Sequence, residues 1–572
     1  VAEIGRRGRL TVAEPLFGPG PTVALSGNSS APPNAIALVE FSAGRAEIIE
    51  KLGRSDRPRD VAQALIREHR GRRSGFPRRL EKEAEAAAAR AASENGDERP
   101  RRDLTGLDTF TVDPASARDF DDAVSARREG DSIRLWIHIA DVAAHVKPGS
   151  ALDREAYERG CSTYVPGTVE PMLPSALSAE ACSLAPGVER LAVTTEVLLG
   201  PDGRPGEPAF YRSRIRSDAR LDYDQLDRVF AGRERPPAPV AEPLELARAA
   251  AASLVDRGAG TALTINTVEP EFEFDSEGRV TRSVAVDETE AHRLIERLMV
   301  LTNELVAQTL ERAGIPTLYR VHERPDPDRV EELFEALAEL DVPTPPLPDH
   351  LQPADAAELV AAVSRSVSET IEREGRGRHA FTSQVLRSLK QAVYSPANRG
   401  HTGLGSAAYC HFTSPIRRYP DLVVHRGLLS RLGAGERPPS AGSIEAIAGQ
   451  CSERERDSIR TERDADDVCA AFLLEREQVE GGYDRTYEGE VTGLIGRGAF
   501  VTFAGELGST YEGMLPAARL GPDWYELNES RTAFVAERGG DDGSARVRLG
   551  DPVTVTVDLI EPARGRVTLA RA

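Results

Sequence analysis

The stretch DPASARDFDD, residues 113–122, contains four aspartates within ten residues: Asp113, Asp119, Asp121 and Asp122. Four carboxylates in one loop repel one another unless a positive charge lies between them. Oxygen ligands select hard cations such as Mg²⁺, which keeps coordination positions open for water and for the phosphate oxygens of a substrate. The stretch therefore predicts a metal site that serves phosphoryl transfer.

A calcium-binding loop and a solvated acidic loop without a metal are the other interpretations of this stretch. An EF-hand calcium loop needs Gly at its sixth position and Glu at its twelfth. Counted from Asp113, these positions hold Arg118 and Val124, and counted from Asp119 they hold Val124 and Gly130, so a calcium loop is excluded. Asp and Glu together make up 92 of the 572 residues, so a solvated acidic loop without a metal stays open on this stretch alone.

The overall composition is that of a globular protein of about three or four domains. The formal net charge is −20, which excludes a histone-like or tail-driven binder of nucleic acid. Any binding of nucleic acid must then come from local groups of arginine.

Cysteine usage and hydropathy predict a cytoplasmic protein. The chain has five cysteines, an odd number, and no C-x-x-C pair, which is typical of a reduced compartment. The first 23 residues contain no apolar run long enough for a signal sequence, and we find nowhere 18 consecutive apolar residues. We expect no contact with a membrane.

The pattern of elements predicts an α+β protein of several domains. Residues 1–50 alternate short β-branched pieces with turn clusters, which indicates a small, partial β-barrel. Residues 51–102 are charged and rich in Ala, and we interpret them as a helical, solvated linker. Residues 103–480 form a mixed α/β domain, with a hairpin from 123–126 and 133–139 and a helix that begins near residue 290 and ends before Gly314 and Pro316.

Residues 485–572 return to short strands separated by Gly and charged turns. Five such strands in fewer than ninety residues predict a small closed barrel of the OB type, a fold that often binds oligonucleotides. The expected fold class is thus a mixed α/β catalytic domain flanked by small OB-type β-barrels.

A second group of chemically informative residues lies in the stretch NRGHTGLGSAAYCHFTSPIRRYPDLVVHR, residues 398–426. Arg417 and Arg418 follow Ser414-Pro415, and Pro420 comes soon after them, so both guanidinium groups lie on a constrained backbone. Arginine suits phosphate because its planar fork donates two parallel hydrogen bonds and keeps its charge. A surface pair without function is the alternative if the segment is taken by itself.

Six motifs, in this order along the chain, resemble the RNase II / RNase R family of exoribonucleases. They are DPASARDFDDA, STYVPGTVEPMLPSALSAEACSLAP, HRLIER, LYRVHERP, SLKQAVYSPANRGH and HFTSPIRRYPDLVVHR. The resemblance covers about residues 103–480 as the catalytic RNB domain. It implies an S1-like RNA-binding barrel at 485–572, part of a cold-shock-like barrel at 1–50, and processive hydrolysis of RNA from the 3′ end that needs Mg²⁺ and releases 5′-monophosphates.

The resemblance also implies roles for individual residues. The four aspartates are expected to be catalytic and to bind the metal in a two-metal displacement. Arg417 is expected to clamp the scissile phosphate. The residues expected to contact RNA are Tyr164 and Glu296 at the terminal nucleotide, Arg418 beside Arg417, and Phe500 and Phe503 as stacking rings on the barrel.

Some positions depart from the family's pattern. Asn266 stands where the family has an aromatic that sandwiches the last bases opposite Tyr164. Thr402 replaces an aromatic, Arg297 replaces an acid, and Pro516 replaces a histidine.

Single-stranded RNA is the expected partner of a monomer without an organic cofactor. An inactive relative that binds RNA as a regulator is the alternative, and the complete set of aspartates argues against it. A nuclease for DNA or a dinucleotide stays open, because recognition of the ribose 2′-OH leaves no trace in residue spacing.

Overall fold

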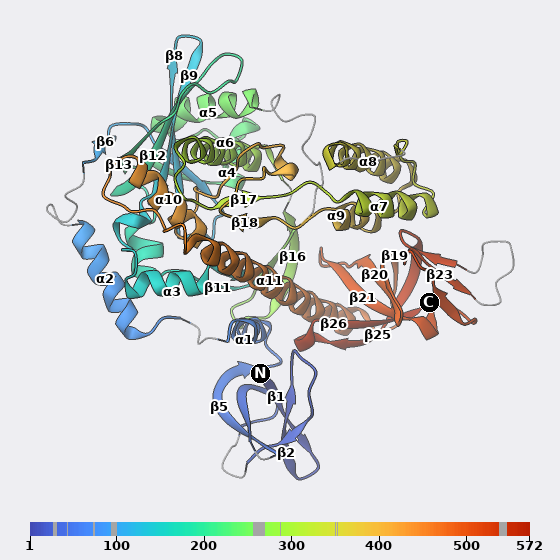
Figure 1. Cartoon of the computed structure of the whole chain (residues 1–572). Coiled ribbons are helices and arrows are strands. Elements are labelled where there is room, and N and C mark those ends of the chain that lie inside the picture. Colours follow the sequence, from blue (N-terminus) through green and yellow to red (C-terminus); the bar gives the residue numbers. More distant parts are fainter. Residues whose placement is uncertain are drawn as a thin grey trace.

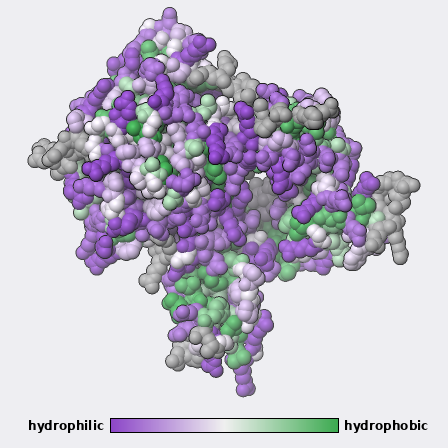
Figure 2. All heavy atoms as spheres, in the orientation of Figure 1, coloured by the Kyte–Doolittle hydropathy of each residue, from purple (hydrophilic) through white to green (hydrophobic). Residues whose placement is uncertain are grey.

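Figure 1 shows the computed structural model, in which a large α/β body lies beside a helical group and two small β modules. The residues that the structure describes are 1–26, 31–42, 44–71, 75–92, 100–254, 269–286, 288–348, 351, 353–536 and 546–572. Within these ranges no helix is long and apolar enough to cross a membrane. Figure 2 shows hydrophilic residues over most of the visible face, with apolar residues gathered near the N-terminal module and parts of the C-terminal barrel.

The N-terminal module is a five-stranded sheet in the order β3-β2-β1-β4-β5. Leu25, just after β3, bridges to Ala46 of β5, so the two edges of the sheet approach each other. The strands are β1 (Ala2–Arg7), β2 (Leu10–Pro15), β3 (Val23–Ala24), β4 (Ala35–Ser42) and β5 (Arg45–Arg54). The module therefore extends beyond residue 50, where the sequence predicts its end.

The segment predicted as a helical, solvated linker does contain two helices, but both are packed against the rest of the protein, so only the expectation that it is solvated is wrong. Helix α1 (Pro58–Arg70) buries Val61 and Leu65 in a cluster that includes Val468 of helix α11. Helix α2 (Arg78–Ala92) buries Leu80 and Ala84 in the main core. Both helices are charged overall but carry a narrow apolar stripe at helical spacing, which is enough to dock them.

The α/β body is built on a mixed seven-stranded sheet in the order β14-β7-β8-β9-β12-β13-β6. The predicted hairpin is present as β8 and β9, in antiparallel register from Asp122 opposite Ile139 to Glu129 opposite Ser132. The strands are β6 (Arg102–Asp103), β7 (Phe110–Asp113), β8 (Asp122–Glu129), β9 (Ser132–Ala140), β12 (Glu189–Leu199), β13 (Ala209–Arg216) and β14 (Ala219–Asp222).

Helices and four short strands in two pairs complete the body, and helix α10 is buried along most of its length. The predicted helix near residue 290 is α6, which ends at Gly314 in a left-handed cap. The helices are α3 (Ala151–Arg159), α4 (Tyr223–Phe230), α5 (Ala241–Ser253), α6 (Glu290–Ala313) and α10 (Tyr419–Arg431), and the small strands are β10 (Thr163–Val165), β11 (Thr168–Glu170), β17 (Tyr319–Val321) and β18 (Val393–Ser395).

Helix α11 (Ile444–Gly481) is 38 residues long and runs from the body to the C-terminal barrel. It contacts α1, β10, β18 and a short turn of the barrel along its length. One helix thus connects the body, the N-terminal segment and the barrel (Figure 1).

The C-terminal barrel is closed, in the order β19-β20-β21-β26-β25, which confirms the predicted five-stranded barrel. Its strands are β19 (Thr486–Ile495), β20 (Gly498–Ala504), β21 (Thr510–Pro516), β25 (Pro552–Glu561) and β26 (Arg566–Arg571), and β22 (Tyr525–Leu527), β23 (Ala533–Ala536) and β24 (Arg546–Arg548) form a side sheet.

The barrel shares its core with a helical group from the middle of the chain. Leu333 of α7 and Phe381 of α9 belong to the same buried cluster as Val501 and Leu515 of the barrel. The elements of this group are α7 (Pro327–Glu339), α8 (Pro353–Glu374) and α9 (Ala380–Ser388), with the hairpin β15 (Glu269–Phe274) and β16 (Val280–Val286) beside them. Removing the barrel would expose that common core.

Candidate active site

The aspartate loop connects two adjacent strands of the central sheet. Strand β7 ends at Asp113, Pro114 follows it, and β8 begins at Asp122. The two ends of the loop therefore lie at the same end of two adjacent strands of the sheet. The N–H of Ala140, at the end of β9, donates to the carbonyl of Asp121 at 2.9 Å and holds the loop's last turn against the sheet.

The buried hydroxyl of Ser183 fixes the middle of the loop. It accepts a hydrogen bond from the N–H of Phe120 at 3.0 Å and donates to the carbonyl of Arg118 at 2.8 Å. The N–H of Leu184 donates to the carbonyl of Phe120 at 2.9 Å. These hydrogen bonds hold the backbone of the loop, and its carboxylates point into the protein. The stretch is therefore not a solvated acidic loop.

The four aspartates face a cavity of about 550 Å³ together with Arg417, Arg418, Tyr164 and Glu296. The structure therefore brings together all the residues that the sequence predicts for the body's site. Other residues of the wall are Tyr223, Glu288, His292, Asn303, Tyr409 and Ser414.

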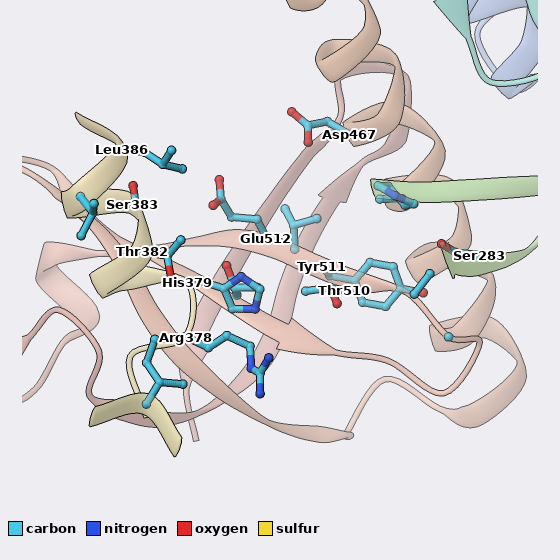
Figure 3. A pocket seen from close by; sticks show the side chains of 18 of the residues that line it. Ser283, Arg378, His379, Thr382, Ser383, Leu386, Asp467, Thr510, Tyr511 and Glu512 are labelled. Atoms are coloured by element: carbon cyan, nitrogen blue, oxygen red, sulfur yellow. The ribbon is translucent and has the colours of Figure 1, made fainter. Parts of the chain in front are cut away.

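Two larger cavities lie elsewhere. One of about 640 Å³ lies between α8, α9, α11 and the barrel, where Asp467 and Glu512 face it (Figure 3). The other, of about 810 Å³, lies between the N-terminal module, α11 and the barrel. Neither is lined by an aspartate of the loop or by Arg417, so volume alone does not mark the site.

Burial places the aspartate charges under strain. It raises the pKa of Asp113 to about 8, with Asp122 adding repulsion and Arg220 opposing the shift. It also raises the pKa of Asp122 to about 6, against the opposing charges of Arg417 and Arg418. The pKa of Asp121 is raised well above its usual value by burial, although Arg417 and the N–H of Ile416 favour its charged form.

Two buried carboxylate oxygens of this cavity, Oδ2 of Asp113 and Oδ2 of Asp121, accept no hydrogen bond from the described residues. The other oxygen of Asp121 accepts from the N–H of Ile416 at 2.8 Å, while its Oδ2 has the Nε of Arg417 3.5 Å away. Buried anions normally have partners. These oxygens therefore mark a place for a cation.

The donor set consists of carboxylate oxygens, the ligand type that hard cations such as Mg²⁺ prefer. No three His, Cys, Asp or Glu side chains of the described ranges are grouped so that they could hold a metal ion by themselves. Mg²⁺ usually takes one or two carboxylates and completes its shell with water and substrate phosphate. The oxygens of Asp113 and Asp121 that accept no hydrogen bond suit that mode of binding.

The two neighbouring arginines have different surroundings. The side chain of Arg417 is 48% exposed, and its Nη2 lies 3.3 Å from Oγ of Ser414. Arg418 is 24% exposed and donates two hydrogen bonds of 2.8 Å to Asp421, in the first turn of α10. Arg417 is thus turned toward the cavity, whereas much of the Arg418 guanidinium is engaged by Asp421, and its predicted contact with RNA stays a prediction.

Tyr164 and Glu296 lie on opposite elements of the wall. Tyr164 projects from β10, 39% exposed, and its hydroxyl donates to Oδ2 of Asp119 at 3.2 Å. Burial and the charge of Asp119 raise the pKa of the Tyr164 hydroxyl. Glu296 projects from α6, where burial and Glu288 raise the pKa of its carboxyl.

The barrel residues Phe500 and Phe503 do not reach this cavity. Phe503 is 2% exposed, with its ring 5.0 Å from that of Tyr487 and 5.7 Å from that of Tyr511, so its predicted role as a stacking ring is wrong. Phe500 lies on the outer face of β20 and is half-buried. Residues three apart on a strand point to opposite faces, so strict alternation could have separated the two.

Sequence reasoning missed Tyr223 and His292 in the wall. Their rings stack with centroids 3.9 Å apart, and Asp122 and Asp113 help burial to raise the pKa of Tyr223. His292 lies four residues before Glu296 on α6, a spacing that puts both on one helix face and could have revealed it. Asn266, which bears on the predicted clamp, lies outside the described residues.

Comparisons with known proteins show which family and fold the chain resembles. The family described as RNB domain matches residues 101–433. Ribonuclease R of Escherichia coli is 35% identical over 483 residues, which is 80% of this chain and 56% of that protein. The chain thus spans just over half the length of this relative.

Solved structures share the fold. Mycoplasma genitalium RNase R in complex with ribose methylated single-stranded RNA matches with a TM-score of 0.86 at 24% identity, over 100% of this chain and 89% of that one. Yeast Ssd1, a pseudonuclease, matches with a TM-score of 0.66 at 17% identity, over 94% of this chain and 68% of that one. At these identities the fold alone is shared, and a pseudonuclease has it too.

Proposed function

The chain belongs to the RNB-domain family, and we propose that it hydrolyses single-stranded RNA processively from the 3′ end in a Mg²⁺-dependent reaction that releases nucleoside 5′-monophosphates. The observation that carries this proposal is the convergence of four aspartates and Arg417 on one cavity, with two buried carboxylate oxygens that have no donor among the described residues. Carboxylates that bind a cation beside an arginine that binds phosphate form a site suited to a phosphodiester substrate.

Arg417 is the residue best suited to hold the scissile phosphate. Its charge is permanent, and it is the exposed member of the arginine pair. Fixed donors aimed at charge that develops in the transition state lower the barrier. Arg418 helps to position Arg417, because the hydrogen bonds from Arg418 to Asp421 fix the backbone from which Arg417 projects.

The aspartates provide the anionic side of the site. Their buried oxygens would hold Mg²⁺, and a bound ion would acidify a water molecule and neutralise charge on the leaving 3′ oxygen. Asp121 is kept in place by the N–H of Ile416, and Asp119 by the hydroxyl of Tyr164. The loop is therefore arranged before the substrate arrives.

Tyr164 and Glu296 orient the terminal nucleotide. The partly exposed Tyr164 ring offers an apolar face for a base, a contact worth about 1–3 kcal/mol that does not depend on sequence. The Glu296 carboxylate lines the same cavity and is able to accept hydrogen bonds from ribose hydroxyls.

An inactive RNA-binding relative is the alternative, because a pseudonuclease has the same fold. The complete and strained set of aspartates favours an enzyme. A protein that only binds RNA gains nothing from buried carboxylates whose charges repel both one another and phosphate.

The five cysteines are free and four of them are buried, which fits the reduced cytoplasm that we propose as the location. We further propose that the protein acts as a monomer without an organic cofactor.

The test uses 5′-end-labelled single-stranded RNA incubated with the purified chain, with Mg²⁺ or with EDTA, beside DNA of the same sequence. We expect the labelled RNA to shorten only with Mg²⁺, with a short labelled end product appearing while full-length substrate remains, and DNA to stay intact. RNA that is bound but uncut would support the inactive relative, and equal cutting of DNA would show a nuclease without RNA specificity.

A further inference from the structure

The strand that carries Tyr164 is held from two sides. Strand β10 pairs with β11 along one edge, with Tyr164 opposite Val169. At its other edge, the backbone N–H of Tyr164 donates to Oε1 of Glu462 on α11 at 3.0 Å. A carboxylate thus takes the place that a third strand would occupy in a wider sheet.

A second residue of α11 extends this contact. The hydroxyl oxygens of Ser458 and Thr163 lie 2.8 Å apart, and Ser458 donates to Oε1 of Glu462 at 3.1 Å. Ser458 and Glu462 are four residues apart, so they project from one face of the helix. Consecutive residues of β10, Thr163 and Tyr164, are therefore both bound by α11.

The same turn of α11 is fixed from the N-terminal segment. Nδ1 of His69 on α1 lies 3.1 Å from Oγ1 of Thr461, and its Nε2 lies 3.4 Å from Asp464. Helices α1 and α11 also pack through a common apolar cluster. Glu462 is consequently carried by a helix turn that has little freedom to shift.

We propose that Glu462 is a positioning residue that sets where the Tyr164 ring lies over the terminal nucleotide, and so sets the shortest RNA that the protein retains. Tyr164 is attached at both ends: its backbone to Glu462 and its hydroxyl to Asp119. Glu462 is not among the residues that line the cavity, so it acts through Tyr164 and not on the substrate. This inference rests on the proposed exonuclease function.

The role is short-range and depends on an acceptor oxygen. A hydrogen bond from a backbone N–H to a carboxylate is shorter and stronger than one between neutral groups. Glutamine keeps an acceptor for the Tyr164 N–H and for Ser458, whereas alanine leaves both donors without that partner. The proposal therefore separates Glu462→Gln from Glu462→Ala.

The experiment follows the final products of single-stranded RNA on a denaturing gel, and the steady-state constants of a long and a short oligomer. The variants are Glu462→Ala, Glu462→Gln and, as a matched control, Glu453→Ala, which removes an exposed glutamate from the same helix. Melting temperatures show whether each variant is folded.

We expect Glu462→Ala to stop at a longer final product and to raise KM for the short oligomer by up to about tenfold, the size of one weakened aromatic stack. Turnover and KM on long RNA should stay within about twofold, because contacts farther along the strand still hold it. Glu462→Gln and Glu453→Ala should give the wild-type ladder.

Identical final lengths for wild type and a folded Glu462→Ala would overturn the proposal. If Glu462→Ala does not fold, Ser458→Ala decides, since it removes one hydroxyl of the same contact and should shift the final length in the same direction; an unchanged ladder then overturns the proposal. A wild-type protein that leaves RNA uncut would instead refute the proposed function, so the two failures are distinguishable.

Discussion

The hydroxyl of Tyr164 donates a hydrogen bond to Oδ2 of Asp119 at 3.2 Å, which joins the ring proposed to stack on the terminal nucleotide to the aspartate loop. On sequence alone, this ring is expected to contact the terminal nucleotide. The contact gives Tyr164 two separable parts, a ring face and a hydroxyl.

Substituting Tyr164 should separate these parts. Tyr164→Ala removes the ring and should leave a longer final product, because a stack worth about 1–3 kcal/mol is lost. Tyr164→Phe keeps the ring and should preserve the final length, but should slow cleavage severalfold, because Asp119 loses its donor. Product ladders and single-turnover rates measure the two effects, and identical ladders for all three proteins would show that the ring does not set the end point.

Asp121→Asn should abolish cleavage but not binding. It removes one charge from the proposed cation site, so we expect cleavage in Mg²⁺ to fall by about 10²–10³-fold or more. RNA should bind at least as tightly, since one repulsive anion is gone. End-labelled cleavage and fluorescence anisotropy measure the two, and Asp131→Asn, in the exposed β8–β9 turn, is the control. Turnover near wild type would refute the assignment.

Asp113→Asn should stabilise the metal-free protein at neutral and alkaline pH. Because burial raises the pKa of Asp113 from 3.8 to about 8, the folded state keeps a proton that the unfolded state releases. Stability is therefore lost as pH rises through this window. In EDTA, the melting temperature of the variant should exceed that of wild type by roughly a few degrees at pH 8 and should match it near pH 4. Parallel pH profiles would contradict this.

Replacing Phe500 or Phe503 by alanine should affect different properties of the protein, RNA binding in the first case and stability in the second. Phe503→Ala should lower the free energy of unfolding by about 3–5 kcal/mol, because it empties a buried site between Tyr487 and Tyr511. Phe500→Ala should cost little stability but weaken RNA binding, because its ring lies on the outer face. Denaturant unfolding and RNA titration test both, and the two variants serve as controls for each other.

Arg417 and Arg418 should also differ. Arg418→Ala leaves the buried Asp421 without its bidentate partner, which should cost about 3–5 kcal/mol of folding free energy. Arg417→Ala should leave the melting temperature nearly unchanged and lower the rate of cleavage at saturating RNA by about 10²–10³-fold. Equal losses of stability in the two variants would contradict the separation of their roles.

The chemistry of the site could be predicted from the sequence because it is written in short, local patterns. Four aspartates in ten residues predict a cation site whatever the surrounding fold. The alternation of strands and turns after residue 485 is enough to predict a closed barrel. The different surroundings of Phe500 and Phe503 also follow from a local rule, because side chains alternate along a strand and residues three apart point to opposite faces.

The charged, Ala-rich segment 51–102 shows where composition misleads. Its average composition is that of a solvated linker, yet Val61 and Leu65 of α1 pack against α11. Only a stripe of side chains on each helix decides packing, and an average over the segment conceals that stripe.

Short local patterns are enough to predict an aspartate loop, a basic segment around Arg417 and a small barrel, because each depends on residues near one another in the chain. The folded structure is needed to see that Glu462 holds Tyr164, that Tyr223 and His292 form a wall beside the aspartates, and that the barrel shares its core with α7 and α9. These contacts join residues far apart in the chain, and which of many compatible side chains meet depends on how whole helices and sheets pack.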